Sequence, residues 1–195
     1  MHILFVADPL ESFQTYKDTT FSMMREAQRR GHHIAACEPR QLLWQQGGVV
    51  QAHTRRITLT GQADRWFEEQ PGAVLALHRF DAIVMRKDPP FDSEYFYATH
   101  LLEQAEREGA KVFNKPRALR DHPEKLAIME FPQHIGPTLV TRDAQAVRAF
   151  HAEHQDIILK PLDGMGGMGI FRVKADGLNL GSIIETVSYT HLRAH

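Results

Sequence analysis

Residues 156–173 read DIILKPLDGMGGMGIFRV. An apolar segment typical of a strand ends at Lys160, a loop with four glycines follows, and residues 170–173 again alternate like a strand. Glycine lets backbone N–H groups approach an anion closely, and a lysine at the end of the incoming strand adds a positive charge beside them. The stretch therefore predicts a loop between two strands that binds the phosphates of a nucleotide.

This run differs from the two commonest phosphate-binding loops. A Walker A loop has Gly-Lys-Ser/Thr leading into a helix, whereas here Lys160 precedes the glycines and no Ser or Thr follows them. A dinucleotide-binding loop also leads into a helix, but residues 170–173 indicate a strand. A flap that closes over phosphates, as in protein kinases, fits the order of elements. An ordinary hairpin connection stays open as the alternative, because Gly-rich turns are common.

Composition bounds the class of protein. With 195 residues, 43% hydrophobic and 24% charged, the chain is typical of a globular protein with one large or two small domains. A net charge of -1, without a basic stripe, argues against a nucleic-acid partner. The apolar stretches are strand-sized and residues 1–20 lack a signal-peptide pattern, so we expect a cytoplasmic protein with no membrane partner. The single Cys37 excludes an intramolecular disulfide and is best interpreted as a buried strand residue.

Strands and helices alternate over the first 120 residues. Residues 2–7 and 33–37 read as strands, joined by a helix that Thr19 or Thr20 caps and Gly31 ends. This β-α-β order predicts an α/β fold with an open parallel sheet. Further expected elements follow along the chain: a β-hairpin excursion over 41–60, a strand over 81–86, a helix that Ser93 caps and that runs to Glu108, and a strand over 111–114.

A second domain is expected after Arg120. Pro123 suits the first turn of a helix that runs towards Phe131 and carries Lys125. The remaining expected elements are a strand over 138–140, a helix over 144–154 capped by Thr141, a strand over 156–160, and a helix over 178–186. Residues 187–195 show no clear pattern.

Several polar residues are candidates for chemistry. Arg86, Lys87 and Asp88 follow a predicted parallel strand, where open α/β sheets place ligands, and Arg86 suits a substrate carboxylate. The loop after the first strand offers Asp8 and either Lys17 or Asp18, which line the same cleft or are simply loop residues. Lys125 is either a phosphate ligand or a solvated lysine.

Other site classes lack support. The 12 histidines show no metal-binding spacing, and neither a Gly-x-Ser-x-Gly elbow nor a base beside Cys37 can be identified. The sequence therefore assigns no catalytic nucleophile and no metal ligand.

Seven segments together resemble, in order, bacterial (prokaryotic-type) glutathione synthetases of the ATP-grasp superfamily. They are AQRRG (27–31), AHTR (52–55), VMRKDPPFD (84–92), VFNKP (112–116), LRD (119–121), EKL (124–126) and ILKPLDGMGG (158–167). The resemblance runs from the first strand to about Thr186. Separate segments in register are far more specific than one glycine loop.

The resemblance implies a substrate domain over 1–120 and the first part of an ATP-grasp domain over 121–186. In that family ATP phosphorylates the cysteinyl carboxylate of γ-glutamylcysteine, and glycine attacks the acyl phosphate to give glutathione. It also implies Mg²⁺, or Mn²⁺, with ATP, and a homo-oligomer. By resemblance Lys125 and Lys160 are ATP-contacting lysines, the phosphate-covering loop contains Gly164, Met165, Gly166 and Gly167, and Arg86 and Asp88 lie in a substrate segment.

The end of the chain departs from the family. Residues 187–195 do not resemble what should follow Thr186, and we expect a non-family tail there. The family's metal ligands and the second wall of its ATP cleft lie further on, so we expect no metal ligand here and an inactive fragment. Two alternatives stay open: another ATP-grasp carboxylate-amine ligase, and a non-catalytic nucleotide-binding fragment.

Overall fold

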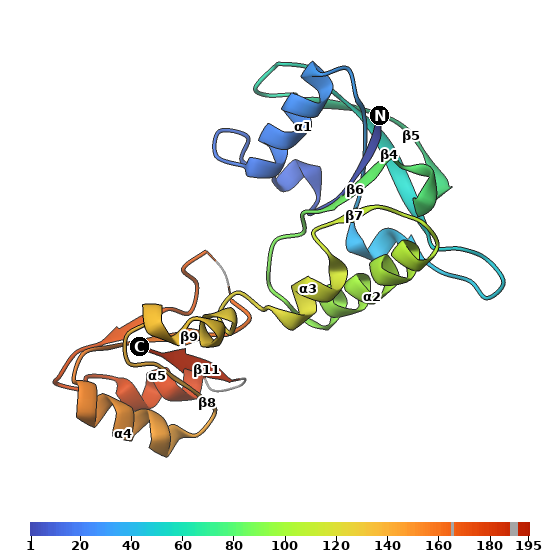
Figure 1. Cartoon of the computed structure of the whole chain (residues 1–195). Helices are drawn as coiled ribbons and strands as arrows, with labels where there is room; N and C mark the ends of the chain where they lie inside the picture. Colours follow the sequence, from blue (N-terminus) through green and yellow to red (C-terminus); the bar gives the residue numbers. More distant parts are fainter. Residues whose placement is uncertain (165, 188–190) are drawn as a thin grey trace. The chain divides into compact units, whose positions relative to one another are not determined.

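The computed structural model describes residues 1–164, 166–187 and 191–195. Its contacts divide the chain into two compact units. The first unit contains residues 1–88 and 92–121, and the second contains residues 89–91 and 122–195 (Figure 1). Each unit combines a β-sheet with helices.

The first unit is built on a mixed sheet of order β3-β4-β2-β1-β6-β7, with β5 paired to β4. Its parallel strands are β1 (His2–Val6), β2 (His33–Cys37), β6 (Ala82–Met85) and β7 (Val112–Phe113). Its antiparallel strands are β3 (Leu42–Leu43), β4 (Gln51–Leu59) and β5 (Phe67–Ala76). The predicted α/β fold with an open parallel sheet is confirmed.

Helices α1 (Thr19–Arg29) and α2 (Ser93–Arg107) connect neighbouring parallel strands. The β1-α1-β2 and β6-α2-β7 connections step in opposite directions along the sheet, so right-handed crossovers place the helices on opposite faces. Met24 of α1 is fully buried in a core with Phe5 and Ile34. On α2, Leu102 is fully buried, whereas Phe96 is 40% exposed.

Aspartates cap three helices of the chain. The carboxylates of Asp18, Asp92 and Asp143 accept hydrogen bonds from the backbone N–H groups of Phe21, Tyr95 and Gln145 at 2.9, 2.9 and 2.8 Å. The prediction that Thr19 or Thr20, Ser93 and Thr141 are the caps was wrong by one or two residues. A carboxylate accepts the same hydrogen bonds as a hydroxyl and also stabilises the positive end of the helix dipole.

Strand β5 is an element that the sequence did not predict. Its residues include Glu68, Glu69, Gln70 and Pro71, which lack an apolar alternation and are exposed. The strand forms because it pairs with β4 from Leu59↔Phe67 to Gln51↔Ala76. Pro71 is tolerated because its register position coincides with an irregularity on an outer strand.

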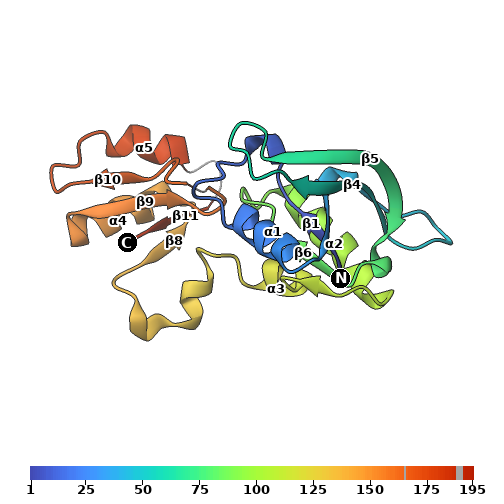
Figure 2. The ribbon, with the colours of Figure 1, turned by 90° about the horizontal axis from the view of Figure 1, so that it is seen from above.

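The second unit contains an antiparallel sheet of order β10-β9-β11-β8, whose strands lie next to one another in Figure 2. Its strands are β8 (Leu139–Thr141), β9 (Ile157–Pro161), β10 (Phe171–Val173) and β11 (Leu192–Ala194). Helices α4 (Ala144–His154) and α5 (Leu180–Val187) contribute Val147 and Ile184 to a core with Leu159. Because β9 and β10 are hydrogen-bonded neighbours, the glycine run is a loop between two strands, as predicted.

The predicted helix over residues 123–131 was wrong. The N–H groups of Leu126 and Ala127 both donate to the carbonyl of Pro123 at 2.9 Å, and a 3-10 helix, η4 (Ala127–Glu130), follows. Lys125 therefore lies on a turn. Pro132 disfavours helical geometry at Phe131, so no helix continues past this segment.

The remaining elements are short. An unpredicted helix, α3 (Pro116–Asp121), ends the first unit. The other 3-10 helices are η1 (Leu10–Ser12), η2 (Pro39–Gln41), η3 (Leu77–Arg79) and η5 (Pro132–His134). Across the residues that the structure describes, none of the helices is long and apolar enough to cross a membrane.

Cys37 is the last residue of β2 and is only 2% exposed. Burial, with a smaller contribution from the charge of Glu38, raises the pKa of its thiol to about 12. The thiol is therefore protonated and unreactive at neutral pH. The interpretation of Cys37 as a buried strand residue is confirmed.

Neighbouring methionines of α1 provide a test of the first core. Met24→Ala should lower the free energy of unfolding by about 2–5 kcal/mol, because it leaves a cavity against Phe5 and Ile34. Met23→Ala is the control, since Met23 is 42% exposed, and its effect should stay within about 0.5 kcal/mol. Urea unfolding followed by tryptophan fluorescence reports on the first unit, which contains Trp44 and Trp66. Equal effects of the two changes would contradict this packing.

Candidate functional site

The second unit contains a cavity of about 250 Å³ beside the glycine loop. Its lining includes the predicted residues Lys125, Lys160, Gly164, Gly166 and Gly167. Lys125 and Lys160, which are 35 positions apart in the sequence, thus line the same cavity. Met165, predicted with them, lies outside the described residues.

Lys160 is positioned by strand β9. Ile157 and Leu159 of this strand are buried in the core, so the strand alternation turns Lys160 towards the other face. On the neighbouring strand β11, Arg193 is its direct partner in the antiparallel register and also lines the cavity. Two like charges directly opposite one another destabilise a sheet, and an anion between them relieves the repulsion.

Further observations indicate a positive potential at this face. The pKa of His195 is lowered, first by burial and then by the charges of Lys160 and Arg193. Within the part of the chain that the structure describes, the buried Nε of Arg193 has no hydrogen-bond partner. The same holds for one buried carboxylate oxygen of Asp163, next to the glycine loop.

Lys125 links the turn after Pro123 to the glycine loop. Its ammonium donates to the carbonyl of Leu162 at 3.2 Å and also to the carbonyl of Gly164. The acceptors are Leu162 and the first glycine of the loop, so a single cation holds the first part of the loop. This contact places a third positive charge at the cavity.

The loop itself requires glycine at its centre. Gly166 and Gly167 have φ angles of 61° and 81°, a conformation that side chains disfavour. Met168 and Ile170 line the cavity beside them and are 69% and 42% exposed. The loop thus offers backbone groups flanked by exposed apolar side chains.

A second cluster of predicted residues lies in the first unit, after β1 and β6. The Nε of Arg86 donates to the hydroxyl of Thr20 at 3.0 Å, and its Nη2 donates to the hydroxyl of Thr19 at 2.7 Å. Arg86 therefore fastens the start of α1 to the end of β6. The sequence identified Arg86 but not these two threonine partners.

Asp8 joins the loops that follow β1 and β6. One of its carboxylate oxygens lies 2.9 Å from the ammonium of Lys87, and the other accepts the backbone N–H of Asp88 at 2.8 Å. The structure thus brings Asp8, Lys87 and Asp88 together after the carboxyl ends of β1 and β6. Asp18 caps α1, and the ammonium of Lys17 lies 5.7 Å from the centre of the Tyr16 ring.

The sequence missed Arg193 in the cavity because residues 187–195 show no clear pattern. The available signal was the alternation Leu192-Arg193-Ala194, in which Leu192 and Ala194 are fully buried. Among residues 1–164, 166–187 and 191–195, no group of three or more His, Cys, Asp or Glu side chains is arranged to hold a metal ion.

Sequence models of two related domains match the chain. The model described as prokaryotic glutathione synthetase, N-terminal domain, matches residues 1–120. The model described as prokaryotic glutathione synthetase, ATP-grasp domain, matches residues 124–194.

Curated relatives extend beyond the matched region. The chain is 56% identical over 193 residues to a glutathione synthetase of Ralstonia nicotianae and 50% identical over 191 residues to one of Nitrosomonas europaea. These alignments cover 99% and 96% of this chain but 59% of each relative. The chain thus spans about three fifths of the length of these relatives.

Solved structures share the fold at low sequence identity. A D-cycloserine synthetase superposes with a TM-score of 0.63 at 15% identity, covering 99% of this chain and 58% of its own. D-alanyl-alanine synthetase A from Vibrio cholerae superposes with a TM-score of 0.61 at 13% identity, covering 100% and 59%. The fold is therefore that of ATP-grasp ligases.

The contact of Lys125 with the loop predicts its effect on loop dynamics. Lys125→Met should speed amide hydrogen exchange in a peptide spanning residues 162–173 by about tenfold, because two carbonyls lose a charged donor. Lys174→Met is the control, since Lys174 is an exposed lysine in the same unit. Mass spectrometry of exchange in the intact chain measures the difference. Equal exchange in both variants would show that Lys125 does not hold the loop.

Proposed function

The chain belongs to the prokaryotic glutathione synthetase family, and from this membership we propose that it supplies the acid-binding domain and the phosphate-binding loop of an ATP-dependent carboxylate-amine ligase. The proposed reaction joins γ-glutamylcysteine and glycine to form glutathione. The observation that supports it most is the convergence of Lys125, Lys160 and the glycine loop on one cavity.

ATP is the proposed ligand of this cavity. Lys160 and Arg193 face each other across neighbouring strands, and Lys125 adds a third cation. Phosphate oxygens placed among these groups satisfy charges that otherwise repel one another. The backbone N–H groups at Gly164, Gly166 and Gly167 would donate to the same oxygens, and Met165 lies in this loop.

The reaction proceeds through an acyl phosphate. A cysteinyl carboxylate oxygen attacks the γ-phosphorus, the bond from that phosphorus to the oxygen bridging the β-phosphate breaks, and ADP leaves with the electron pair. The glycine amine then attacks the acyl carbon, phosphate leaves, and the amine proton passes to solvent. In such transfers the protein mainly positions the reactants and offsets negative charge, which is a role for Lys125 and Lys160. Mg²⁺, or Mn²⁺, bound with ATP would neutralise further phosphate charge.

The polar cluster of the first unit is the proposed site for γ-glutamylcysteine. Arg86 uses Nε and Nη2 to bind Thr20 and Thr19, which holds the guanidinium in place and leaves Nη1 to bind a substrate carboxylate. The exposed side chain of Asp88 would bind the substrate's ammonium group. This arrangement makes Arg86 a rigid anchor rather than a mobile surface residue.

We place the protein in the cytoplasm and propose that the intact protein is a homo-oligomer, as the family resemblance implies. A reducing compartment agrees with Cys37, whose buried thiol stays protonated at neutral pH.

Nucleotide binding provides a direct test. Lys160→Ala and Lys125→Ala should each weaken ATP binding to the 195-residue chain by roughly 10- to 100-fold, because each removes a charge-assisted hydrogen bond. Lys174→Ala, a change at an exposed lysine of the same unit, should leave the affinity unchanged. Isothermal titration calorimetry with MgATP measures all three. An affinity that does not depend on Lys160 would refute the assignment of the cavity.

The ligase activity is testable with a chimera. The 195-residue chain alone should form no glutathione from ATP, Mg²⁺, γ-glutamylcysteine and glycine. Residues 1–187 joined to the remaining C-terminal part of the Ralstonia nicotianae relative should form it. In this chimera Arg86→Met should raise the KM for γ-glutamylcysteine at least about tenfold, because a charge-assisted hydrogen bond is lost.

Arg40→Met is the matched control in the chimera, since Arg40 is exposed and pairs with Glu38 at 2.9 Å. Turnover of another acid in place of γ-glutamylcysteine would support a different carboxylate-amine ligase. A folded chimera that binds ATP but converts neither γ-glutamylcysteine nor another acid would support a non-catalytic nucleotide-binding protein.

A further inference from the structure

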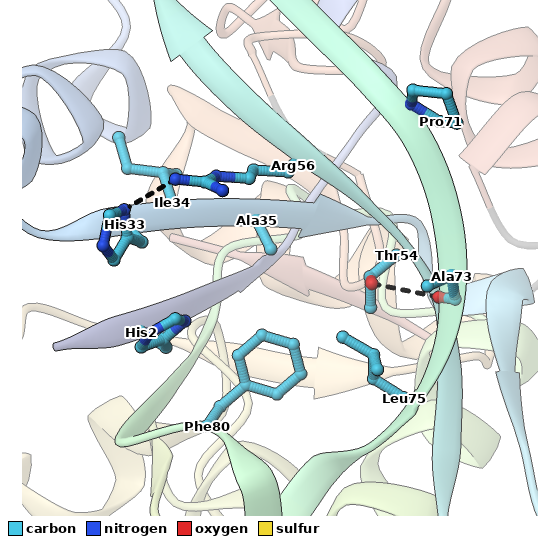
Figure 3. A pocket seen from close by; sticks show the side chains of 10 residues that line it. All are labelled: His2, His33, Ile34, Ala35, Thr54, Arg56, Pro71, Ala73, Leu75 and Phe80. Carbon is cyan, nitrogen blue, oxygen red and sulfur yellow. Dashed lines mark hydrogen bonds between the residues drawn. The ribbon is translucent and has the colours of Figure 1, made fainter.

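A second cavity, of about 130 Å³, lies in the first unit at the amino ends of the parallel strands. His2 and His33, the first residues of β1 and β2, lie at its rim (Figure 3). Asp8 and Arg86 follow the opposite ends of β1 and β6, about 15 Å away for strands of this length. The cavity is therefore separate from the proposed substrate cluster.

The floor of the cavity is apolar. Ala35 of β2 and Ala73 of β5 leave room because their side chains are small, and Leu75 and Phe80 close the far side (Figure 3). The register of β4 and β5 shifts between Thr54 and Arg56, and such irregularities increase the local bend and twist of a strand. The outer strand thus forms a wall instead of continuing a flat sheet.

The rim carries positive charge. The Nη2 of Arg56 lies 2.9 Å from Nδ1 of His33, and the rings of His2 and His33 are 4.8 Å apart (Figure 3). Because a guanidinium only donates, Nδ1 of His33 accepts and its ring proton lies on Nε2. Among the described residues, the other guanidinium N–H groups of Arg56 have no hydrogen bond to the protein.

The electrostatics of His33 agree with this picture. Its pKa is lowered, first by the charge of Arg56 and then by desolvation and the charges of His2 and the N-terminal amine. Asp81 accepts the backbone N–H of His2 at 2.6 Å, and this bond lowers the pKa of Asp81. Arg56 lines the cavity, whereas Asp81 binds the backbone of β1 and is not among the lining residues.

We propose that this cavity binds a small carboxylate with a compact apolar body, about the size of benzoate. The guanidinium of Arg56 matches a carboxylate, which it binds through two parallel hydrogen bonds. The body covers Ala35 and Ala73, which a bare inorganic anion would leave accessible to water. A cavity of about 150 Å³ is known to accommodate benzene in another protein, so a volume of 130 Å³ suits a ring of this size.

The site does not depend on the ligase proposal. All its lining residues belong to the first unit, and none of them lines the cavity of the glycine loop. Loss of ATP binding in the lysine variants would therefore leave the carboxylate site unaffected.

Titration of the 195-residue chain with benzoate tests the proposal. NMR of the imidazole carbon-bound protons should show saturable shifts at His2 and His33, and the pKa of His33 should rise because an anion lies beside it. Calorimetry should give a dissociation constant that Arg56→Gln increases at least tenfold. Arg40→Gln, at an exposed arginine that pairs with Glu38, should not change it.

Two variants that fill the cavity test whether the apolar body of the ligand enters it. Two further probes test the carboxylate charge and the apolar body of the ligand separately. Ala73→Leu, on the exposed strand β5, and Ala35→Leu should each abolish binding while the tryptophan unfolding midpoint is retained. If Ala35→Leu unfolds the protein, Ala73→Leu alone decides. Benzyl alcohol and inorganic phosphate should bind at least tenfold more weakly than benzoate.

Three outcomes would overturn the proposal. The first is the absence of saturable shifts at His2 and His33. The second is equal affinity in Arg56→Gln and Arg40→Gln. The third is phosphate binding as tight as benzoate binding, which would identify a site for bare anions.

Discussion

The pairing of β9 with β10 is the constraint on which the candidate site depends. Leu159 and Phe171 are register partners on these two strands, so both ends of the glycine run are held at the spacing of adjacent strands, about 4.8 Å. The intervening residues must leave the sheet and return, which forms a flap. Pairing of β9 with β11 on its other side adds Arg193 beside Lys160. One strand thus positions the flap and two of the three cations.

These cations explain why the cavity favours an anion. Lys160 and Arg193 repel each other across the sheet, and Lys125 satisfies its ammonium with two carbonyls of the loop. Phosphate oxygens would relieve the repulsion between Lys160 and Arg193. They would also compete with the two loop carbonyls for the ammonium of Lys125. The proposed nucleotide binding would therefore be coupled to the loop through Lys125, because the same ammonium would serve both. A loop held by a single cation can change its position without disturbing the core of the unit.

The first unit uses both edges of its parallel sheet. At the carboxyl edge, Asp8 and Arg86 tie loops and the start of α1 into a polar cluster. At the amino edge, the β4-β5 excursion leaves an apolar hollow with Arg56 and His33 at its rim. Backbone direction separates the two, because parallel strands bring all their amino ends to one edge and all their carboxyl ends to the other.

The sequence by itself determined what depends on near neighbours. Apolar alternation and glycine positions identified the parallel strands, the flap after Lys160 and the residues after β6, because these follow from local geometry. The caps were displaced by one or two residues, because an aspartate beside the expected hydroxyl residue caps each helix. Residues 123–131 read as a helix, but the structure forms a turn and a 3-10 helix there. That residues 187–195 form a non-family tail stays a prediction. Only the tertiary structure decided β5, the Lys160–Arg193 pair and the hollow at Arg56, because each requires contacts between distant residues whose own sequence carries no matching pattern.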